Sequence, residues 1–247
     1  MSSHEFKGMD SIEIMPGVRV TKDKCLVLDE GPTIVLSDLH LGYEKALEEE
    51  GVYLPRINTE SVVESLNKVV YKYDPKRVVI LGDIKHDFRR ASYEAREEVC
   101  RTINLLKDVA DVIIIKGNHD NFIQSVLQDL NVEAVDYIDM YGFRMEHGHL
   151  DSGKRPVIIG HEHPSVRISG AVGGGIKLQC FLHLKREGII VIPPFSNLSS
   201  GSSLGNPETF ISPACKASYT DDADVYGVSD FGVLYLGKLG EVSKMEL

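Results

Sequence analysis

Continuous apolar runs recur along the chain and predict buried strands. Four of them are short and rich in β-branched residues: Thr33–Leu36, Val78–Leu81, Val112–Ile115 and Val157–Ile159. Runs that are apolar at every position suit strands covered on both faces of a sheet. Further strands are predicted at Phe143–Glu146, Leu178–Leu184, Gly188–Ile192 and Gly232–Leu236. After residue 163 the alternation of strands and turns indicates antiparallel or mixed pairing.

Apolar residues at helical spacing predict two helices between these strands, over Asn58–Tyr73 and Ser92–Lys107. The order of elements predicts an α/β fold in which two sheets carry helices on their outer faces. The chain of 247 residues can bury a full core and has no Ser/Pro/Gly-rich linker that would separate two units. We therefore expect a single domain over residues 1–247, with the motifs in a core at 31–195 and an irregular loop at 197–213.

Polar motifs follow the apolar runs directly, and together they hold seven of the nine histidines. They are Asp38-Leu39-His40, Gly82-Asp83-Ile84-Lys85-His86, Gly117-Asn118-His119-Asp120, His147-Gly148-His149 and Gly160-His161-Glu162-His163. In open α/β sheets, sites form at the carboxyl ends of the strands. Asp, His and Asn bind Mn, Fe or Zn, and two such ions about 3.5–4 Å apart can contact both the attacking and the leaving oxygens of a phosphate ester. The set therefore indicates one two-metal hydrolytic site.

Single motifs carry much less information than the set. An isolated Asp-x-His is more often a capped strand end with a solvated Asp, and Gly-Asp dipeptides are common turns. The two histidines of Gly160-His161-Glu162-His163 are the strongest pair, because imidazoles two residues apart after a buried strand commonly bind metals. Glu162 is expected to face away from them.

Composition changes this picture little. The net charge of −10 argues against a surface coated for non-specific nucleic-acid binding, although bound divalent ions would reverse the sign locally. The four cysteines are widely spaced and suggest neither disulfides nor a zinc ribbon. Residues 1–10 are polar and no apolar run approaches about 20 residues, so we expect a cytoplasmic protein without a membrane partner.

The ordered motifs of residues 38–163 resemble those of the calcineurin-like metallophosphoesterase superfamily. This resemblance implies a four-layer αββα sandwich and a dinuclear centre. One metal would be bound by Asp38, His40, Asp83 and His163, and the other by Asp83, Asn118, His147 and His161, with His119 as the general acid. The choice of His147 over His149 rests on the strand predicted immediately before it, and His149 remains the alternative ligand. Mn²⁺ is the expected ion, with Fe, Zn and Ni as alternatives.

His86 provides evidence on the subfamily. Phosphatases of the superfamily usually have Asp three residues after the bridging Asp, whereas a His there resembles SbcD-like repair nucleases and their small archaeal relatives. His86 would then assist catalysis, and Arg89, Arg90 and Arg167 are candidates for binding the substrate phosphate. The alternative is that His86 is a polar loop residue and that the arginines are ordinary solvated charges. This chain also has little room after residue 200 for the DNA-binding region of SbcD-like nucleases.

The sequence is compatible with three functions. The first is a Mn-dependent phosphodiesterase or nuclease related to DNA-repair enzymes, with DNA or RNA as substrate. The second is a phosphatase or phosphodiesterase for small molecules such as nucleotides, which the acidic composition favours. The third is a non-catalytic scaffold, but such proteins usually lose ligands and here every ligand position is filled. The sequence leaves protein partners and oligomeric state open.

Overall fold

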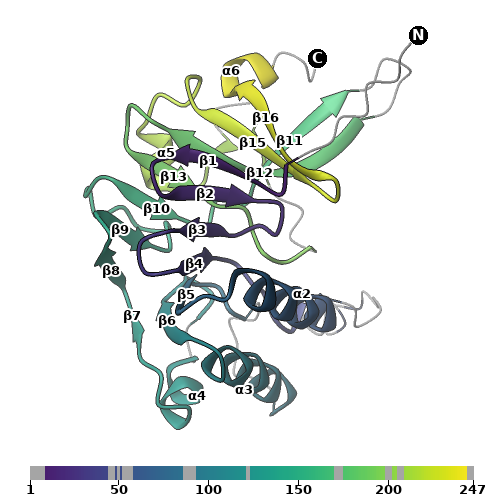
Figure 1. Cartoon of the computed structure of the whole chain (residues 1–247), viewed down its shortest axis with the longest axis vertical. Coiled ribbons are helices and arrows are strands. Elements are labelled where there is room, and N and C mark those ends of the chain that lie inside the picture. Colours follow the sequence, from purple (N-terminus) through teal and green to yellow (C-terminus); the bar gives the residue numbers. More distant parts are fainter. Residues whose placement is uncertain are drawn as a thin grey trace.

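The computed structural model describes residues 9–43, 48, 51, 58–85, 93–120, 123–169, 175–197, 202–204 and 209–243. Two β-sheets pack face to face and carry helices on their outer faces (Figure 1). The α/β sandwich of two mixed sheets is thereby confirmed.

The first sheet has the order β1-β2-β3-β4-β5-β6-β7. Its strands are β1 (Ser11–Met15), β2 (Val18–Thr21), β3 (Leu26–Leu28), β4 (Thr33–Leu36), β5 (Arg77–Leu81), β6 (Asp111–Ile115) and β7 (Ala134–Val135). Strands β4 to β7 are parallel, whereas β1 to β4 pair antiparallel. The predicted strands correspond to β4, β5 and β6, and the antiparallel extension β1–β3 was not predicted.

Helices α2 (Asn58–Tyr73), α3 (Tyr93–Lys107) and α4 (Ile123–Asp129) cover the outer face of this sheet. Figure 1 shows α2 and α3 beside β4 to β6. Leu66 of α2 and Ile103 of α3 are fully buried in one cluster with Leu36 and Ile80 of the sheet. Both predicted helices are confirmed, and Ser92, the predicted first residue of the second, lies outside the described residues.

The second sheet has the order β14-β11-β12-β13-β10-β9-β8, and β15 pairs with both β12 and β16. Its strands are β8 (Tyr137–Met140), β9 (Phe143–Glu146), β10 (Val157–Ile159), β11 (Pro164–Ser169), β12 (Gly175–Leu184), β13 (Ile189–Val191), β14 (Ser202–Ser203), β15 (Asp224–Ser229) and β16 (Gly232–Lys238). Strand β10 is parallel to β9 and β13, while β11–β12, β12–β13 and β15–β16 are antiparallel. The mixed pairing predicted for this half is confirmed.

The segment predicted as an irregular loop at 197–213 contains one short strand among its described residues. Ser202 and Ser203 form β14, which pairs in parallel with Pro164 and Ser165 of β11. A two-residue strand of serines shows no apolar alternation in the sequence, so periodicity cannot predict it.

The outer layer of the second sheet is thinner than that of the first. It contains α5 (Pro213–Lys216) and α6 (Leu239–Val242), each of four residues. Their buried residues pack with Phe210 against apolar side chains of β10, β12 and β15. The prediction of outer helices therefore holds for both sheets, but here two short turns provide the cover.

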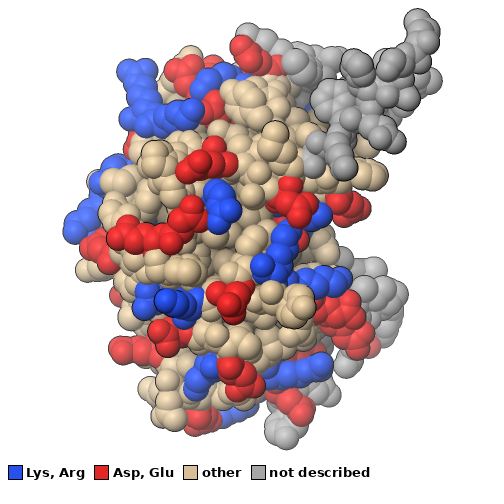
Figure 2. All heavy atoms as spheres, in the orientation of Figure 1, with Lys and Arg blue, Asp and Glu red and all other residues tan. Residues whose placement is uncertain are grey.

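Side chains between the two sheets form the central core, which includes Leu81, Met145, Ile158 and Phe181. None of the helices that the structure describes is both long enough and apolar enough to cross a bilayer. On the face in Figure 2, acidic and basic side chains are intermixed rather than gathered into a basic surface.

Candidate metal centre

The loops after β4 and β5 run side by side and bring the first two motifs together. The backbone N–H of Asp38 donates to Gly82 O at 3.1 Å, and that of His40 donates to Asp83 O at 3.0 Å. A third bond from Leu41 N to Ile84 O, at 2.8 Å, continues the pairing. The side chains of Asp38, His40 and Asp83 are therefore held at one sheet edge, where all three are buried.

Five of the predicted ligands have left-handed backbone, which few side chains adopt. Their φ angles are 56° at Asp38, 45° at His40, 50° at Asp83, 62° at His161 and 47° at His163. Such residues cluster at functional sites, where the surrounding structure offsets a cost of about 1–3 kcal/mol each. The left-handed conformation turns the chain sharply after each strand and presents the side chains to the edge of the sheets.

Glycines allow these loops to approach closely. A Cβ on Gly117 would lie 2.1 Å from Asp83 Oδ1, and a Cβ on Gly160 would lie 1.8 Å from Ser37 Oγ. Both distances are far below van der Waals contact, so each motif needs a glycine next to its neighbour's carboxylate or hydroxyl.

Asp38, His40 and His163 form the first cluster, with ligand-type atoms within 4.8 Å of one another. His163 Nε2 lies 3.1 Å from Asp38 Oδ1 and 3.3 Å from His40 Nε2. Asp38 Oδ1 is buried and accepts no hydrogen bond, while Oδ2 accepts the backbone N–H of His161 at 3.0 Å. A buried carboxylate oxygen that lies beside imidazoles but accepts no hydrogen bond suits a bound cation.

Asp83, His147 and His161 form the second cluster, again within 4.8 Å. His147 Nε2 lies 3.4 Å from Asp83 Oδ2 and 3.1 Å from Asn118 Oδ1. Its Nδ1 is 2.6 Å from Leu81 O and must donate to it, because a carbonyl oxygen only accepts. This bond orients the ring so that Nε2 points toward the cluster, as in histidines that bind metals.

His149 lies beside the second cluster but outside it. Its ring is 5.3 Å from that of His147 and 6.2 Å from that of His161. The second cluster includes His147 and not His149, and the choice of His147 as the ligand stays a prediction.

The buried charges perturb one another strongly. Burial alone would raise the pKa of Asp38, but His163, His147 and His40 together lower it well below its usual range. Burial would lower the pKa of His147, yet Asp83 and Asp38 raise it to about 9. Burial and the neighbouring His147 lower the pKa of His161 to about 4. Such a dense group of carboxylates and imidazoles is typical of functional sites.

Asp120 supports the centre without belonging to either cluster. Its carboxylate accepts the backbone N–H groups of Asp83, Ile84 and Gly117 at 2.8, 3.0 and 2.9 Å. It therefore connects the loops that follow β5 and β6. Its role was not predicted, although its place in the Gly117–Asp120 motif was a signal that it belongs to the site.

Glu162 faces away from the clusters, as expected. It is fully buried, and its carboxylate accepts the N–H of Ile211 at 3.0 Å and that of Ser212 at 2.8 Å. Glu162 thus attaches the segment before α5 to the loop that holds His161 and His163.

His119 stands at the edge of both clusters. Its side chain is 19% exposed, and Nε2 lies 3.8 Å from Asp83 Oδ2. Its ring meets that of His40 edge to face, with centroids 5.4 Å apart. His119 is therefore next to the ligand-type atoms and also reachable from solvent, which a proton donor to a substrate requires.

Four further residues were predicted to take part in catalysis or substrate binding. His86, Arg89 and Arg90 lie outside the residues that the structure describes. Arg167 is exposed on β11, opposite Lys177 of β12 and four residues after His163. Its role in substrate binding stays a prediction.

Comparison with known proteins agrees with this geometry. Residues 31–180, well over half of the chain, match the calcineurin-like phosphoesterase family. No curated protein matches the chain in sequence. The fold is similar to that of nuclease MPE from Pseudomonas putida, with a TM-score of 0.66 and 21% identity over 88% of this chain and 95% of that one. A fainter similarity, with a TM-score of 0.41 and 16% identity over 85% and 94% of the two chains, connects it to YfcE, a phosphoesterase from E. coli. From the family match and the arrangement of the motifs, we conclude that the chain belongs to the calcineurin-like phosphoesterase family.

Proposed function

We propose that this phosphoesterase is a Mn²⁺-dependent phosphodiesterase that cleaves nucleic acid. The observation that carries the proposal is the pair of adjacent clusters, each with one carboxylate and two imidazoles whose ligand-type atoms lie within 4.8 Å. Two such groups side by side suit two divalent ions, and a pair of ions suits in-line displacement at phosphorus.

The proposed ligands are those implied by the motifs. Asp38, His40 and His163 would bind one ion, and Asn118, His147 and His161 the other, with Asp83 shared between them. Carboxylate, amide and imidazole donors together match Mn²⁺, while Fe, Zn and Ni accept the same imidazoles. When bound, the ions would lower the pKa of water and neutralise charge on the phosphate.

His119 is the proposed general acid. Its imidazole would protonate the leaving oxygen, and the bond from its backbone N–H to Asp83 Oδ1, at 2.9 Å, fixes the segment that carries it. The positioned side chain would then complete a bond cleavage that otherwise expels an alkoxide.

Two observations favour a phosphodiester bond of nucleic acid as the substrate. The structurally similar Pseudomonas putida protein is described as a nuclease. The residue three after Asp83 is His86, which in the superfamily resembles repair nucleases rather than phosphatases. A role for this protein in DNA repair would follow from the same resemblance.

The test compares substrates and metal content in one preparation. Purified protein with Mn²⁺ is assayed on single-stranded DNA, duplex DNA, RNA, cyclic dinucleotides and nucleotide monoesters, and bound metal is counted by elemental analysis. We expect two ions per chain and faster cleavage of diesters than of monoesters. Asp83→Asn should lose both ions and the activity, whereas Asp129→Asn, an exposed carboxylate on α4, should retain them. Preference for monoesters would instead support a small-molecule phosphatase, and an absence of metal would support a scaffold.

A further inference from the structure

A cleft of about 550 Å³ borders the second cluster. Asn118 and His147 contribute to its lining, together with residues that belong to no motif, among them Tyr137 and Leu150. It also includes Asp136, which connects the edge strand β7 of one sheet to the edge strand β8 of the other. The cleft therefore lies at the open side of the sandwich, next to the proposed metals.

The register of the β8–β9 pair places Tyr137 in the lining of this cleft. In the β8–β9 pair it lies directly opposite Glu146, the residue before His147. Its side chain remains 51% exposed, and Leu150 nearby is 69% exposed. An exposed aromatic ring and an exposed apolar side chain thus share a cleft with a proposed metal ligand.

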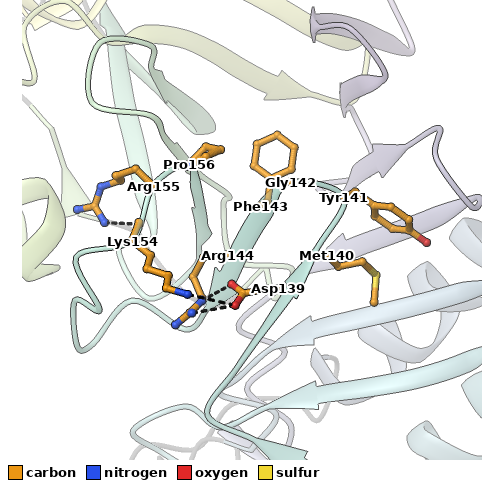
Figure 3. Close-up of a pocket in the computed structure, with 9 residues that line it drawn as sticks. All are labelled: Asp139, Met140, Tyr141, Gly142, Phe143, Arg144, Lys154, Arg155 and Pro156. Carbon is orange, nitrogen blue, oxygen red and sulfur yellow. Dashed lines mark hydrogen bonds and ion pairs between the residues drawn. The ribbon is translucent and has the colours of Figure 1, made fainter.

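One face of the tyrosine ring is already covered. The guanidinium carbon of Arg144 lies 3.7 Å from the ring centroid, and the Arg144 side chain is only 5% exposed. Arg144 pairs with Asp139 through two bonds, at 2.5 and 2.9 Å, and Figure 3 shows Lys154 reaching the same carboxylate. The Arg144–Asp139 ion pair holds the guanidinium against one face of the Tyr137 ring. The exposed part of the ring is therefore fixed in position where it lines the cleft.

The charges of the cleft argue against a second phosphate. Among the described residues, its lining contains the carboxylates of Asp136, Glu146 and Asp151 but a single lysine, Lys116, which lies 3.4 Å from Asp136. Asp151 is in turn paired with Arg155. A lining rich in acceptors, with an aromatic platform and an apolar wall, suits a neutral planar ring that carries N–H donors.

We propose that this cleft binds a nucleobase of the substrate, stacked on Tyr137, while the adjacent phosphate lies at the two clusters. The inference rests on the proposed function and deepens it, since it makes a base-bearing ester the preferred substrate. Stacking on an aromatic side chain tolerates every base, so the cleft would select nucleotides without reading their sequence.

The test uses two single strands of equal length, one of ordinary DNA and one with abasic sugars throughout. Wild type should cleave the ordinary strand with the higher kcat/KM. Tyr137→Ala should lower that value about 5- to 150-fold, the range expected for loss of one stacked base, and leave the abasic strand unchanged. Tyr137→Phe should retain the preference. Tyr71→Ala, a tyrosine 92% exposed on α2, is the matched control and should change neither strand.

A binding measurement makes the inference independent of turnover. Fluorescence anisotropy with both labelled strands, in Ca²⁺ in place of Mn²⁺, should show tighter binding of the ordinary strand, and Tyr137→Ala should abolish this difference. If no strand is cleaved but the binding difference is present and depends on Tyr137, the proposed function fails and the base site stands. Equal binding of the two strands by wild type, or an equal effect of Tyr137→Ala on both, would overturn the base site even if the protein is a nuclease.

Discussion

At the scale of single residues, the ligand-type atoms and the proposed acid are separated by small differences in position. His40 and His163 belong to a cluster, whereas His119, one edge-to-face contact away from His40, does not. The separation predicts that ion binding and proton donation can be removed independently.

His119→Ala should therefore keep both ions while losing turnover by about 10²–10⁴-fold, the usual contribution of a general acid. The loss should be large for a DNA strand, whose leaving group is an alkoxide, and small for a nitrophenyl ester, whose leaving group needs no proton. Elemental analysis and parallel assays on the two substrates check this. A variant that has lost its metal, or an equal loss on both substrates, would assign His119 a different role.

At the scale of elements, the loop between β10 and β11 serves two layers of the fold. Its histidines face the clusters, and Glu162 between them binds the backbone before α5. Burial raises the pKa of Glu162 to about 7 despite those bonds. The thin outer layer of the second sheet is thus connected to the proposed metal centre through one side chain.

Replacing Glu162 with Ala should lower the free energy of unfolding by about 2–5 kcal/mol, because one buried and one partly buried N–H group lose their acceptor. Metal affinity should also fall, although Glu162 is no ligand. Glu162→Gln keeps one acceptor and should lie between the Ala variant and wild type, while Glu133→Ala, at an exposed position, should change neither quantity. Urea unfolding and metal titration are the measurements. Unchanged metal affinity in Glu162→Ala would show that the outer layer and the centre are independent.

Asp224 of β15 forms ion pairs with Lys238 of β16 and with Lys185, which follows β12. Burial alone would raise the pKa of Asp224, but Lys185, Lys238 and Tyr235 lower it to about 2. Both lysines lie 2.7 Å from its carboxylate, and they are 58% and 38% exposed. Because the folded pKa lies below the unfolded value near 3.8, Asp224 stabilises the fold above about pH 4 and loses this contribution as the pH falls toward about 2.

Asp224→Asn should accordingly lower the free energy of unfolding by about 1–2 kcal/mol at neutral pH. The lowered pKa of Asp224 would by itself give a larger loss, but solvent screens the charges of the exposed lysines. The difference from wild type should shrink between about pH 4 and pH 2. Urea unfolding across this range checks the prediction. A difference that stays constant with pH would mean that packing, rather than charge, accounts for it.

The elements differ in how much of them the sequence predicts. Strands β4, β5, β6 and β10 are predictable because each contains at least three consecutive apolar residues, as strands covered on both faces do. Strands β7 and β14 have two residues each and α5 and α6 four, which is too short for any period to appear. The motif residues of the site are predictable because each follows a strand. Tyr137 is not, since only the β8–β9 register places it beside His147.

At the scale of the whole molecule, the fold concentrates buried charge at one edge of two stacked sheets. Asp38 and Asp83 are 0% and 2% exposed, and burial and the charge of Asp38 both oppose the ionisation of Asp83. Bound divalent ions would offset this effect in the folded state alone.

Adding Mn²⁺ to metal-free protein should therefore stabilise it, by about 2.7 kcal/mol at 100 times the dissociation constant, and a chelator should reverse the effect. Thermal unfolding with and without chelator measures the change. Asp38→Asn should respond less, because its cluster keeps only two imidazoles. If the midpoint of wild type is the same in Mn²⁺ and in chelator, the clusters do not bind ions in the folded state.

The left-handed backbone of five proposed ligands also affects how relatives of this chain can diverge. Asp, Asn and His are the residues other than glycine that best tolerate this conformation, and β-branched side chains are the worst. A descendant that lost its chemistry would still be held to these residue types by the shape of its loops. Position 119 has no such constraint, since its φ is not positive. In a degenerate descendant the histidine there would drift before those five residues, and its persistence would be a better sign of retained hydrolysis than the persistence of those five.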